Sequence, residues 1–427
     1  MASTYLTFTQ QTPSTAEAQK FTISMWVKRC GLASIQGLYG NTYSNTHRGY
    51  LYFDSSDRFV FFDSSGTSLV TSRKFRDITG FYHIVVATDT TQGTASNRVK
   101  IYVNGVQETA FDTETYPNQN QDLKIMNTTN TPYMGRIVEA GTSYYLEGIL
   151  SHVHFTQGYV YQASDFGETD STTGEWKINT SPTISNYGTN GFWWLKDSIA
   201  TTDHSPNSNT FTVGGGTLTK TEDCPSNVFT TLNPLSGADT MAVNSTFSNG
   251  NNTVVCSGTV YNAFGSTLGV NKGKFYAEFK TNSAPGDGMI GIFAKLGASG
   301  NYLGSQTHQY SWYNASGGSF KNNSSNLATS VGTYTTNDII GIALDCDNNK
   351  LYFHKNGTYM TYGGGTMNPT SGTYGISITD PDDTDLGFYF MSAMDWGGST
   401  RGNWSANFGN GYFGTTAVAT NSGNGYA

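Results

Sequence analysis

The residues best suited to chemistry form an aromatic run in the second half of the chain. It contains Tyr310, Trp312 and Tyr313, with Tyr302 before it and Asn314 directly after it. Tyr and Trp rings stack on the C–H faces of sugars, while Asn side chains bond sugar hydroxyls. We therefore predict a ligand-binding set of Tyr302, Tyr310, Trp312, Tyr313, Asn314, Trp396 and Trp404. The alternative is that these rings pack on one another or on a neighbouring subunit, and the latter would favour an architectural role.

The densest acidic cluster is Asp380-Pro-Asp-Asp-Thr-Asp385. Carboxylate oxygens on a loop are hard ligands of the kind that Ca²⁺ prefers. The segment therefore predicts a calcium site formed by Asp380, Asp382, Asp383 and Asp385. It lacks the glycine and the distal glutamate of an EF-hand loop, so a solvated turn is the alternative. No other cofactor is expected.

Catalysis is not indicated by the remaining polar residues. Glycoside hydrolysis needs two carboxylates that face the scissile bond, whereas the glutamates of this chain are isolated in sequence. The chain has no Gly-x-Ser-x-Gly motif around a serine nucleophile. His152 and His154 share one expected strand, where they predict either a metal-binding pair or a pair bonded within the sheet. We expect a protein that is not an enzyme.

Composition and charge exclude several classes of partner. Charged residues make up 13% of the chain, and the net charge is −8. The 23 lysines and arginines are scattered, which excludes the basic stripe of a nucleic-acid partner. No stretch approaches the roughly 20 apolar residues of a membrane span, so no membrane insertion is expected. The N-terminus lacks the pattern of a secretory signal, and the four cysteines fit free thiols in a reducing cytosol.

The elements that must position these residues are β-strands. Residues 21–28 alternate apolar and polar side chains, which is typical of a half-buried strand. The segments 87–105 and 343–357 share one pattern: a strand that ends in Asp, a polar turn, and an alternating strand that stops at Asn-Gly. Because Asn and Gly tolerate positive φ, this pair is a strong hairpin signal. The two copies predict an all-β chain with two antiparallel domains.

The composition changes between the two β blocks. Residues 166–235 are rich in Thr, Asn, Ser and Gly, yet Phe192-Trp-Trp-Leu195 is too apolar to lie in solvent. We predict two antiparallel jelly-roll-type β-sandwiches, joined by an irregular connector whose aromatic residues pack on a neighbouring domain. The predicted segments are a first sandwich at 1–165, the connector at 166–235, a second sandwich at 236–415 and a C-terminal tail at 416–427.

Each block is similar to a known domain family. The first resembles the laminin-G and concanavalin A-like sandwiches through the strands at 21–28, 82–89, 99–105 and 146–155. The second resembles a SPRY domain, with the family's segments in order at 273–279, 290–293, 338–345, 351–357 and 407–413. Loops at one end of such a sandwich commonly carry recognition.

The two blocks and the Trp-rich connector together resemble virion structural proteins of tailed phages, such as tail fibres and capsid-surface appendages. The resemblance implies a virion-surface protein that is made in the host cytoplasm. Its expected partners are other virion proteins and a host-surface glycan or protein. A homo-oligomer is expected, and a trimer fits the symmetry of tail parts. A purely architectural capsid decoration or tail adaptor is the second interpretation, and a polysaccharide depolymerase is the third.

Overall fold

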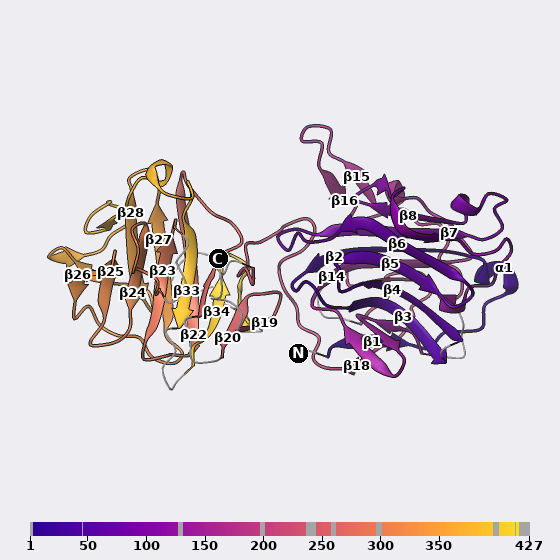
Figure 1. The fold of residues 1–427 in the computed structure, drawn as a ribbon, viewed down its shortest axis with the longest axis horizontal. Helices are drawn as coiled ribbons and strands as arrows, with labels where there is room; N and C mark the ends of the chain where they lie inside the picture. Colours follow the sequence, from indigo (N-terminus) through magenta and orange to yellow (C-terminus); the bar gives the residue numbers. More distant parts are fainter. Residues whose placement is uncertain are drawn as a thin grey trace. The chain divides into compact units, whose positions relative to one another are not determined.

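The computed structural model describes residues 3–44, 46–126, 131–196, 201–235, 245–257, 262–295, 301–395, 401–414 and 416–417. The chain divides into two compact units, which are mostly antiparallel strands (Figure 1). Unit 1 comprises residues 1–220 and 224–228, and unit 2 comprises residues 221–223 and 229–427. The predicted all-β class is confirmed. Within the described ranges, no helix is both long enough and apolar enough to cross a membrane.

Unit 1 is a sandwich of two sheets, which the described residues build from eight and six strands. The larger sheet has the order β10 (Phe111–Thr115), β6 (Thr67–Lys74), β5 (Arg58–Asp63), β4 (His47–Phe53), β3 (Gln36–Ser44), β11 (Tyr133–Met134), β1 (Tyr5–Phe8) and β18 (Phe211–Gly215). The smaller has the order β17 (Phe192–Trp194), β14 (Gly148–Gln157), β2 (Lys20–Arg29), β7 (Tyr82–Asp89), β8 (Val99–Val103) and β9 (Val106–Gln107).

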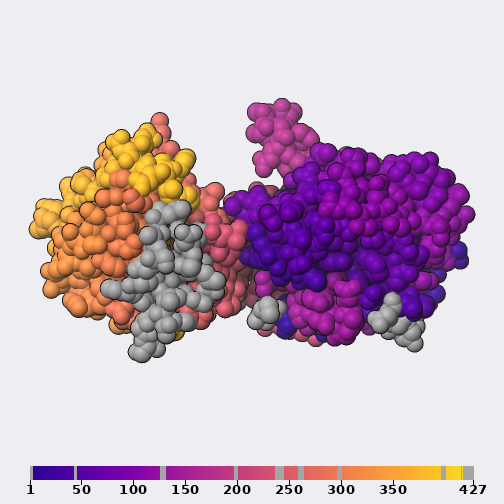
Figure 2. Space-filling view, in the orientation of Figure 1, coloured from indigo at the N-terminus to yellow at the C-terminus, as the bar shows by residue number. Residues whose placement is uncertain are grey.

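Shorter elements complete unit 1. They are the helix α1 (Thr15–Ala18), the 3-10 turns η1 (Ala95–Asn97), η2 (Lys124–Met126) and η3 (Ala163–Asp165), and the hairpins β12 (Arg136–Glu139) with β13 (Thr142–Tyr145) and β15 (Gly167–Thr169) with β16 (Trp176–Ile178). The space-filling view shows the turn between β15 and β16 standing out from the surface of its unit (Figure 2).

Strand β2 shows how the core of unit 1 forms. Phe21, Ile23, Met25 and Val27 alternate along it and enter the core between the two sheets. The sequence predicts that the opposite face meets solvent, but every residue from Phe21 to Arg29 is buried. The half-buried prediction is therefore wrong for this strand, because a third layer covers the outer face of its sheet.

The third layer is the chain that follows β14. Ala163 and Phe166 pack on Val85, Ala87 and Tyr102 of the smaller sheet, and together they form a second apolar cluster. Burying such side chains contributes roughly 25 cal/mol for each Å² of apolar surface that leaves water. The segment that the sequence assigns to a connector is thus part of the first sandwich.

Polar groups under this layer receive partners from it. Trp176 Nε1 donates to His83 Nδ1 at 2.9 Å, and His83 Nε2 bonds Ser24 Oγ at 2.8 Å. His154 Nδ1 bonds the Tyr187 hydroxyl at 3.0 Å. Burial lowers the pKa of His83 to about 3 and holds the pKa of His154 well below its usual value. His154 is thus bonded within the fold, as the second sequence interpretation of the His152 and His154 pair expects.

Strands β17 and β18 place the domain boundary further along the chain than the sequence predicts. Strand β17 pairs with β14, and β18 pairs with β1 at the edge of the larger sheet. Trp194 of β17 is fully buried in the unit-1 core. The predicted boundary at residue 165 therefore lies inside unit 1, because β17 and β18 complete both of its sheets.

Unit 2 is also a two-sheet sandwich in its described part. One sheet has the order β19 (Ser245–Ser248), β20 (Thr253–Cys256), β34 (Asn403–Asn407), β22 (Lys274–Ser283), β27 (Ile339–Asp345), β28 (Lys350–Lys355) and β29 (Thr358–Tyr359), with β32 (Ile376–Ser377) pairing β28. The other has the order β21 (Asn262–Gly265), β33 (Phe390–Asp395), β23 (Gly288–Phe293), β24 (Gln309–Tyr313), β25 (Ser319–Asn322) and β26 (Ser325–Thr329). The remaining elements are β30 (Thr361–Tyr362) with β31 (Gly365–Thr366), β35 (Tyr412–Phe413) with β36 (Thr416–Ala417), and the turn η4 (Pro381–Asp383).

Both Asn-Gly pairs form tight hairpin turns. Asn104-Gly105 joins β8 to β9, and Asn356-Gly357 joins β28 to β29, with φ of 49° and 79° in the first and 49° and 82° in the second. Each Asn Oδ1 also accepts a backbone N–H from the preceding strand, from His83 in unit 1 and from Ile339 in unit 2, both at 2.8 Å. The repeated sequence thus encodes the same turn and the same hydrogen bond from backbone to Asn side chain in both units.

We expect Asn356→Ala to destabilise unit 2 by about 1–2 kcal/mol, because Ala strains at positive φ and cannot accept the Ile339 N–H. Asn356→Gly keeps the turn conformation and loses only the side-chain hydrogen bonds to Ile339 and Asp338, so it should cost less. Denaturant unfolding of the full chain measures both, and Asn104→Ala and Asn104→Gly should show the same ranking in unit 1. Equal stability of the Ala and Gly variants would mean that backbone conformation is not what the Asn supplies.

A buried polar chain lies on the outer face of the β22 and β28 sheet. The Gly357 N–H donates to His354 Nδ1 at 3.2 Å, so the other ring nitrogen carries the proton of the neutral imidazole. That nitrogen, Nε2, lies 2.6 Å from the Tyr276 hydroxyl, which donates to Glu278 Oε1 at 2.6 Å. Burial lowers the pKa of His354 to about 4 and raises the pKa of Glu278.

The neutral His354 predicts a loss of stability in acid. The unfolded chain protonates His near its ordinary pKa of about 6.5, so it binds more protons than the folded state between that pH and about 4. The free energy of unfolding should therefore fall as pH drops through this window, by up to about 3 kcal/mol for this group. Denaturant titrations at a series of pH values measure the slope. His354→Gln, which cannot titrate, should reduce the slope by the share of this group and leave the share of the buried His83 and His154. An unchanged slope would count against a neutral His354.

Candidate functional site

Most of the predicted aromatic run belongs to the core of unit 2. Trp312 and Trp404 are fully buried, and Tyr310 is 6% exposed. Trp312 Nε1 donates to Gly332 O at 2.9 Å, and its ring meets that of Tyr334 edge-on with centroids 5.4 Å apart. These three residues cannot stack on a ligand, so the prediction is wrong for Tyr310, Trp312 and Trp404. Side chains along β24 alternate between the two faces of its sheet, and those of Tyr310 and Trp312 enter the core.

Asn314 is a structural residue as well. Its Nδ2 donates to Pro285 O at 3.0 Å and to Tyr334 O at 2.9 Å, and its Oδ1 accepts Tyr334 N at 2.7 Å. The side chain therefore ties two loops together, and at 7% exposure it is not open to a sugar hydroxyl. The predicted ligand contact at Asn314 is wrong for that reason.

Two members of the predicted set keep part of their surface exposed. Tyr302 and Tyr313 are half-buried, and Lys321 Nζ lies 5.8 and 5.2 Å from their ring centroids. The Tyr313 hydroxyl donates to Asp287 Oδ1 at 2.7 Å. A ligand role for this small surface stays a prediction. Trp396, the remaining member, lies outside the described residues.

The predicted calcium loop directs its carboxylates to separate partners. Asp380 Oδ1 accepts Asp382 N at 3.0 Å, and its Oδ2 accepts Asn349 Nδ2 at 3.1 Å. Asp385 pairs with Lys295 at 2.9 Å and contacts His308 at 3.2 Å, while Asp382 and Asp383 are exposed. Across the described ranges, no three His, Cys, Asp or Glu side chains gather as metal ligands do. The positions of Asp380, Asp382, Asp383 and Asp385 therefore do not support a calcium site.

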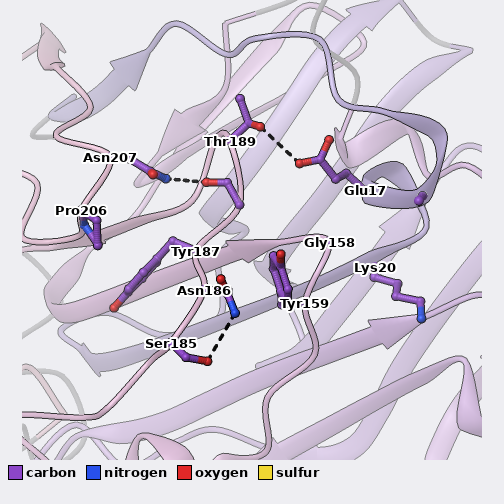
Figure 3. Close-up of a pocket in the computed structure, with 12 residues that line it drawn as sticks. Glu17, Lys20, Gly158, Tyr159, Ser185, Asn186, Tyr187, Thr189, Pro206 and Asn207 are labelled. Carbon is purple, nitrogen blue, oxygen red and sulfur yellow. Dashed lines mark hydrogen bonds between the residues drawn. The ribbon is translucent and has the colours of Figure 1, made fainter.

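An open pocket of about 730 Å³ lies in unit 1, where the sequence predicts no site. Its size falls in the range of small-molecule sites. Tyr159, Asn186 and Tyr187 lie at its centre, with Lys20 to one side and Pro206 and Asn207 to the other (Figure 3). The complete lining is Ala16, Glu17, Lys20, Gly158, Tyr159, Ser185, Asn186, Tyr187, Gly188, Thr189, Pro206 and Asn207.

The loop at 185–191 is held rigidly against the sandwich. Asn190 is buried, and it exchanges two hydrogen bonds with the backbone of Gln11, of 2.6 and 2.7 Å. Its Nδ2 also donates to Gln157 Oε1 at 2.8 Å. Gly188 has a φ of +70°, and a β-carbon there would collide with the backbone carbonyl of Gln157. One wall of the pocket is therefore preformed, which lowers the entropy lost on binding.

The charged groups of the pocket already have partners. Glu17 Oε2 accepts Ser14 N and Ser14 Oγ at 2.9 and 2.8 Å, and its Oε1 accepts Thr189 Oγ1 at 3.2 Å. Burial alone would raise the pKa of Glu17, but these hydrogen bonds outweigh it and lower the pKa. Lys20 Nζ lies 3.5 Å from Asp89 Oδ2. Glu17 therefore stays ionised and does not serve as a general acid at neutral pH.

Sequence reasoning missed this pocket because its lining comes from four distant segments, 16–20, 158–159, 185–189 and 206–207. The available signal was local. Gly158-Tyr159 directly follows a long strand, and Asn186-Tyr187-Gly188 places an aromatic ring within a turn-forming sequence. Nothing in the order of residues shows that these segments meet.

Comparisons with known proteins agree with this architecture. Residues 1–161 match the family model of the concanavalin A-like lectin/glucanases superfamily, in its laminin-G form, and residues 274–369 match the SPRY domain. The chain therefore carries a concanavalin A-like domain followed by a SPRY domain. Domains of both kinds typically bind other molecules. A search of curated proteins finds no match.

Several solved structures are similar in part. The SPRY domain of human HERC1 is 14% identical, covers 38% of this chain and 91% of its own, and has a TM-score of 0.29. Another human SPRY domain is 12% identical, with 39% and 95% covered and a TM-score of 0.26. A heptameric SAP-like pentraxin from Limulus polyphemus is 15% identical, with 38% and 72% covered and a TM-score of 0.27. Similarities at this level support no statement about a ligand.

The different burial of neighbouring aromatics gives a direct test. We expect Trp312→Ala to destabilise unit 2 by about 3–5 kcal/mol, because it empties a fully buried site. Tyr313→Ala should cost much less, because its ring is partly exposed. Denaturant unfolding followed by tryptophan and tyrosine fluorescence compares the two. A Trp312→Ala protein as stable as the parent would restore Trp312 as a candidate for ligand contact.

Proposed function

We propose that this chain is a non-enzymatic recognition protein of a tailed-phage virion surface, which binds a host-surface glycan or protein. The observation that carries the proposal is the pocket of unit 1, which combines the exposed ring of Tyr159 with the side chains of Asn186 and Asn207 beside a preformed wall. Aromatic faces with convergent amides suit binding to a polar ligand.

The same pocket argues against hydrolysis at this site. A glycosidase needs two carboxylates about 5–10 Å apart. The lining contains one carboxylate, Glu17, whose oxygens accept hydrogen bonds from Ser14 and Thr189. Binding is therefore the role that the lining supports, and a depolymerase at this pocket is disfavoured.

The virion setting rests on the resemblance of the two domains and the Trp-rich connector to virion structural proteins of tailed phages, and the few charges and many Asn, Ser and Thr residues are compatible with it. Its proposed partners are other virion proteins and further copies of this chain, with a trimer as the expected state. Many copies on one particle would make weak single sites effective through multivalency. Trp312 and Tyr310 lie in the core of their own unit, so their burial favours neither adhesion nor a purely architectural role.

Competition with the particle tests this proposal. Purified full-length chain should bind intact host cells and reduce the adsorption of particles that contain it, and labelled antibodies should find it on the particle surface in electron micrographs. Heat-denatured chain is the control for adhesion through exposed apolar segments. A chain that labels the particle surface without binding cells would support the architectural alternative, and a chain absent from the surface would contradict both roles.

A further inference from the structure

The pocket of unit 1 depends on a part of the chain outside the matched domain. The match to the concanavalin A-like family ends at residue 161. Ser185, Asn186, Tyr187, Gly188, Thr189, Pro206 and Asn207 all lie beyond it and form more than half of the lining. The pocket is therefore a feature of this chain, built where its added layer meets the sandwich.

Tyr159 presents an aromatic face from a fixed backbone. The residue is 42% exposed, although it lines the pocket. Thr156 Oγ1 donates to Tyr159 O at 2.9 Å, and the N–H of the preceding Gly158 donates to Lys20 O at 2.8 Å. A ring on such a support loses little freedom on binding and can stack on the C–H face of a sugar.

Two amide side chains near this ring retain hydrogen-bonding capacity. Asn207 Nδ2 donates to Gly191 O at 2.8 Å, and within the described part of the chain its Oδ1 accepts no bond. Asn186 lies between Tyr159 and Tyr187 (Figure 3), and its side-chain amide is held by a 3.5 Å contact to Ser185 Oγ. Amide groups of this kind pair with the hydroxyls of a sugar.

The charged groups of the pocket, Glu17 and Lys20, limit which sugars it can bind. Glu17 is occupied by Ser14 and Thr189, and Lys20 is paired with Asp89. The pocket therefore offers no unpaired cation for an acidic sugar, and the Glu17 oxygens are taken up by Ser14 and Thr189. Its remaining groups are an aromatic face and neutral amides.

We propose that this pocket binds a single uncharged sugar unit of a glycan, stacked on Tyr159 and bonded by Asn186 and Asn207, without a metal ion. This inference rests on the proposed recognition function and names the ligand class of its site. Asn190 is a positioning residue, because it holds the 185–191 loop through Gln11 and Gln157 without lining the pocket.

The test uses the full chain on an array of neutral hexose and N-acetylhexosamine oligosaccharides, beside sialylated and sulfated ones, in the presence of a chelator. We expect binding to neutral glycans only. Titration of the best ligand should show Tyr159→Ala about tenfold weaker. Tyr159→Phe, which keeps the ring, should stay within about threefold of the parent. Tyr374→Ala is the matched control, because Tyr374 is 47% exposed and belongs to unit 2, whereas the pocket is lined by residues of unit 1 alone.

Melting temperatures of the three variants should equal that of the parent. A change in affinity can then be attributed to the loss of a contact in the pocket rather than to unfolding. A preference for acidic glycans, a requirement for a metal ion, or equal affinity of Tyr159→Ala and the parent would overturn the proposal. A chain that binds no glycan yet still adsorbs to host cells overturns the saccharide site and leaves the recognition role standing. A chain that neither binds a glycan nor adsorbs to host cells contradicts both the saccharide site and the recognition role.

Discussion

The structure of unit 1 depends on satisfying polar groups beneath its third layer. His83, His154 and Ser24 are buried on the outer face of the smaller sheet. An unpaired buried polar group costs about 1–3 kcal/mol. A third layer that covered this face with apolar side chains alone would therefore destabilise the domain. Trp176 and Tyr187 supply the missing partners from the chain that follows β14. That chain is therefore a required layer of the domain rather than a tether.

The proposed site is a consequence of the same layer. To cover the sheet, the chain must turn at Gly188 and return as β17, and Asn190 fastens this turn to Gln11 and Gln157. The exposed side of the fastened loop then faces Tyr159 and α1 across the pocket (Figure 3). Rigidity that arises from the needs of folding becomes preorganisation for binding. The pocket thus lies where the family-matched domain meets the segment particular to this chain.

Unit 2 shows where pattern reading succeeds and where it fails. The hairpin turn at Asn356-Gly357 depends on neighbouring residues only, so the sequence predicts it directly. Ligand contact is not local. Trp312 and Tyr313 are adjacent in sequence, yet one is fully buried and the other keeps part of its ring exposed, because a strand sends successive side chains to opposite faces. An aromatic run predicts that one face is apolar without showing which ring is left for a ligand.

Local patterns in the sequence are enough to predict the all-β class, the two antiparallel sandwiches and both Asn-Gly turns, because each depends on alternation or on positive φ over a few neighbouring residues. It also indicates, through Trp193 and Trp194, that the connector must pack on something. The contacts that tertiary structure adds are those by which the connector covers the outer face of the smaller sheet and by which Tyr159 and Asn186 line one pocket. Those contacts join segments far apart in the chain, and which surfaces meet is set by the burial of the whole domain rather than by any local preference.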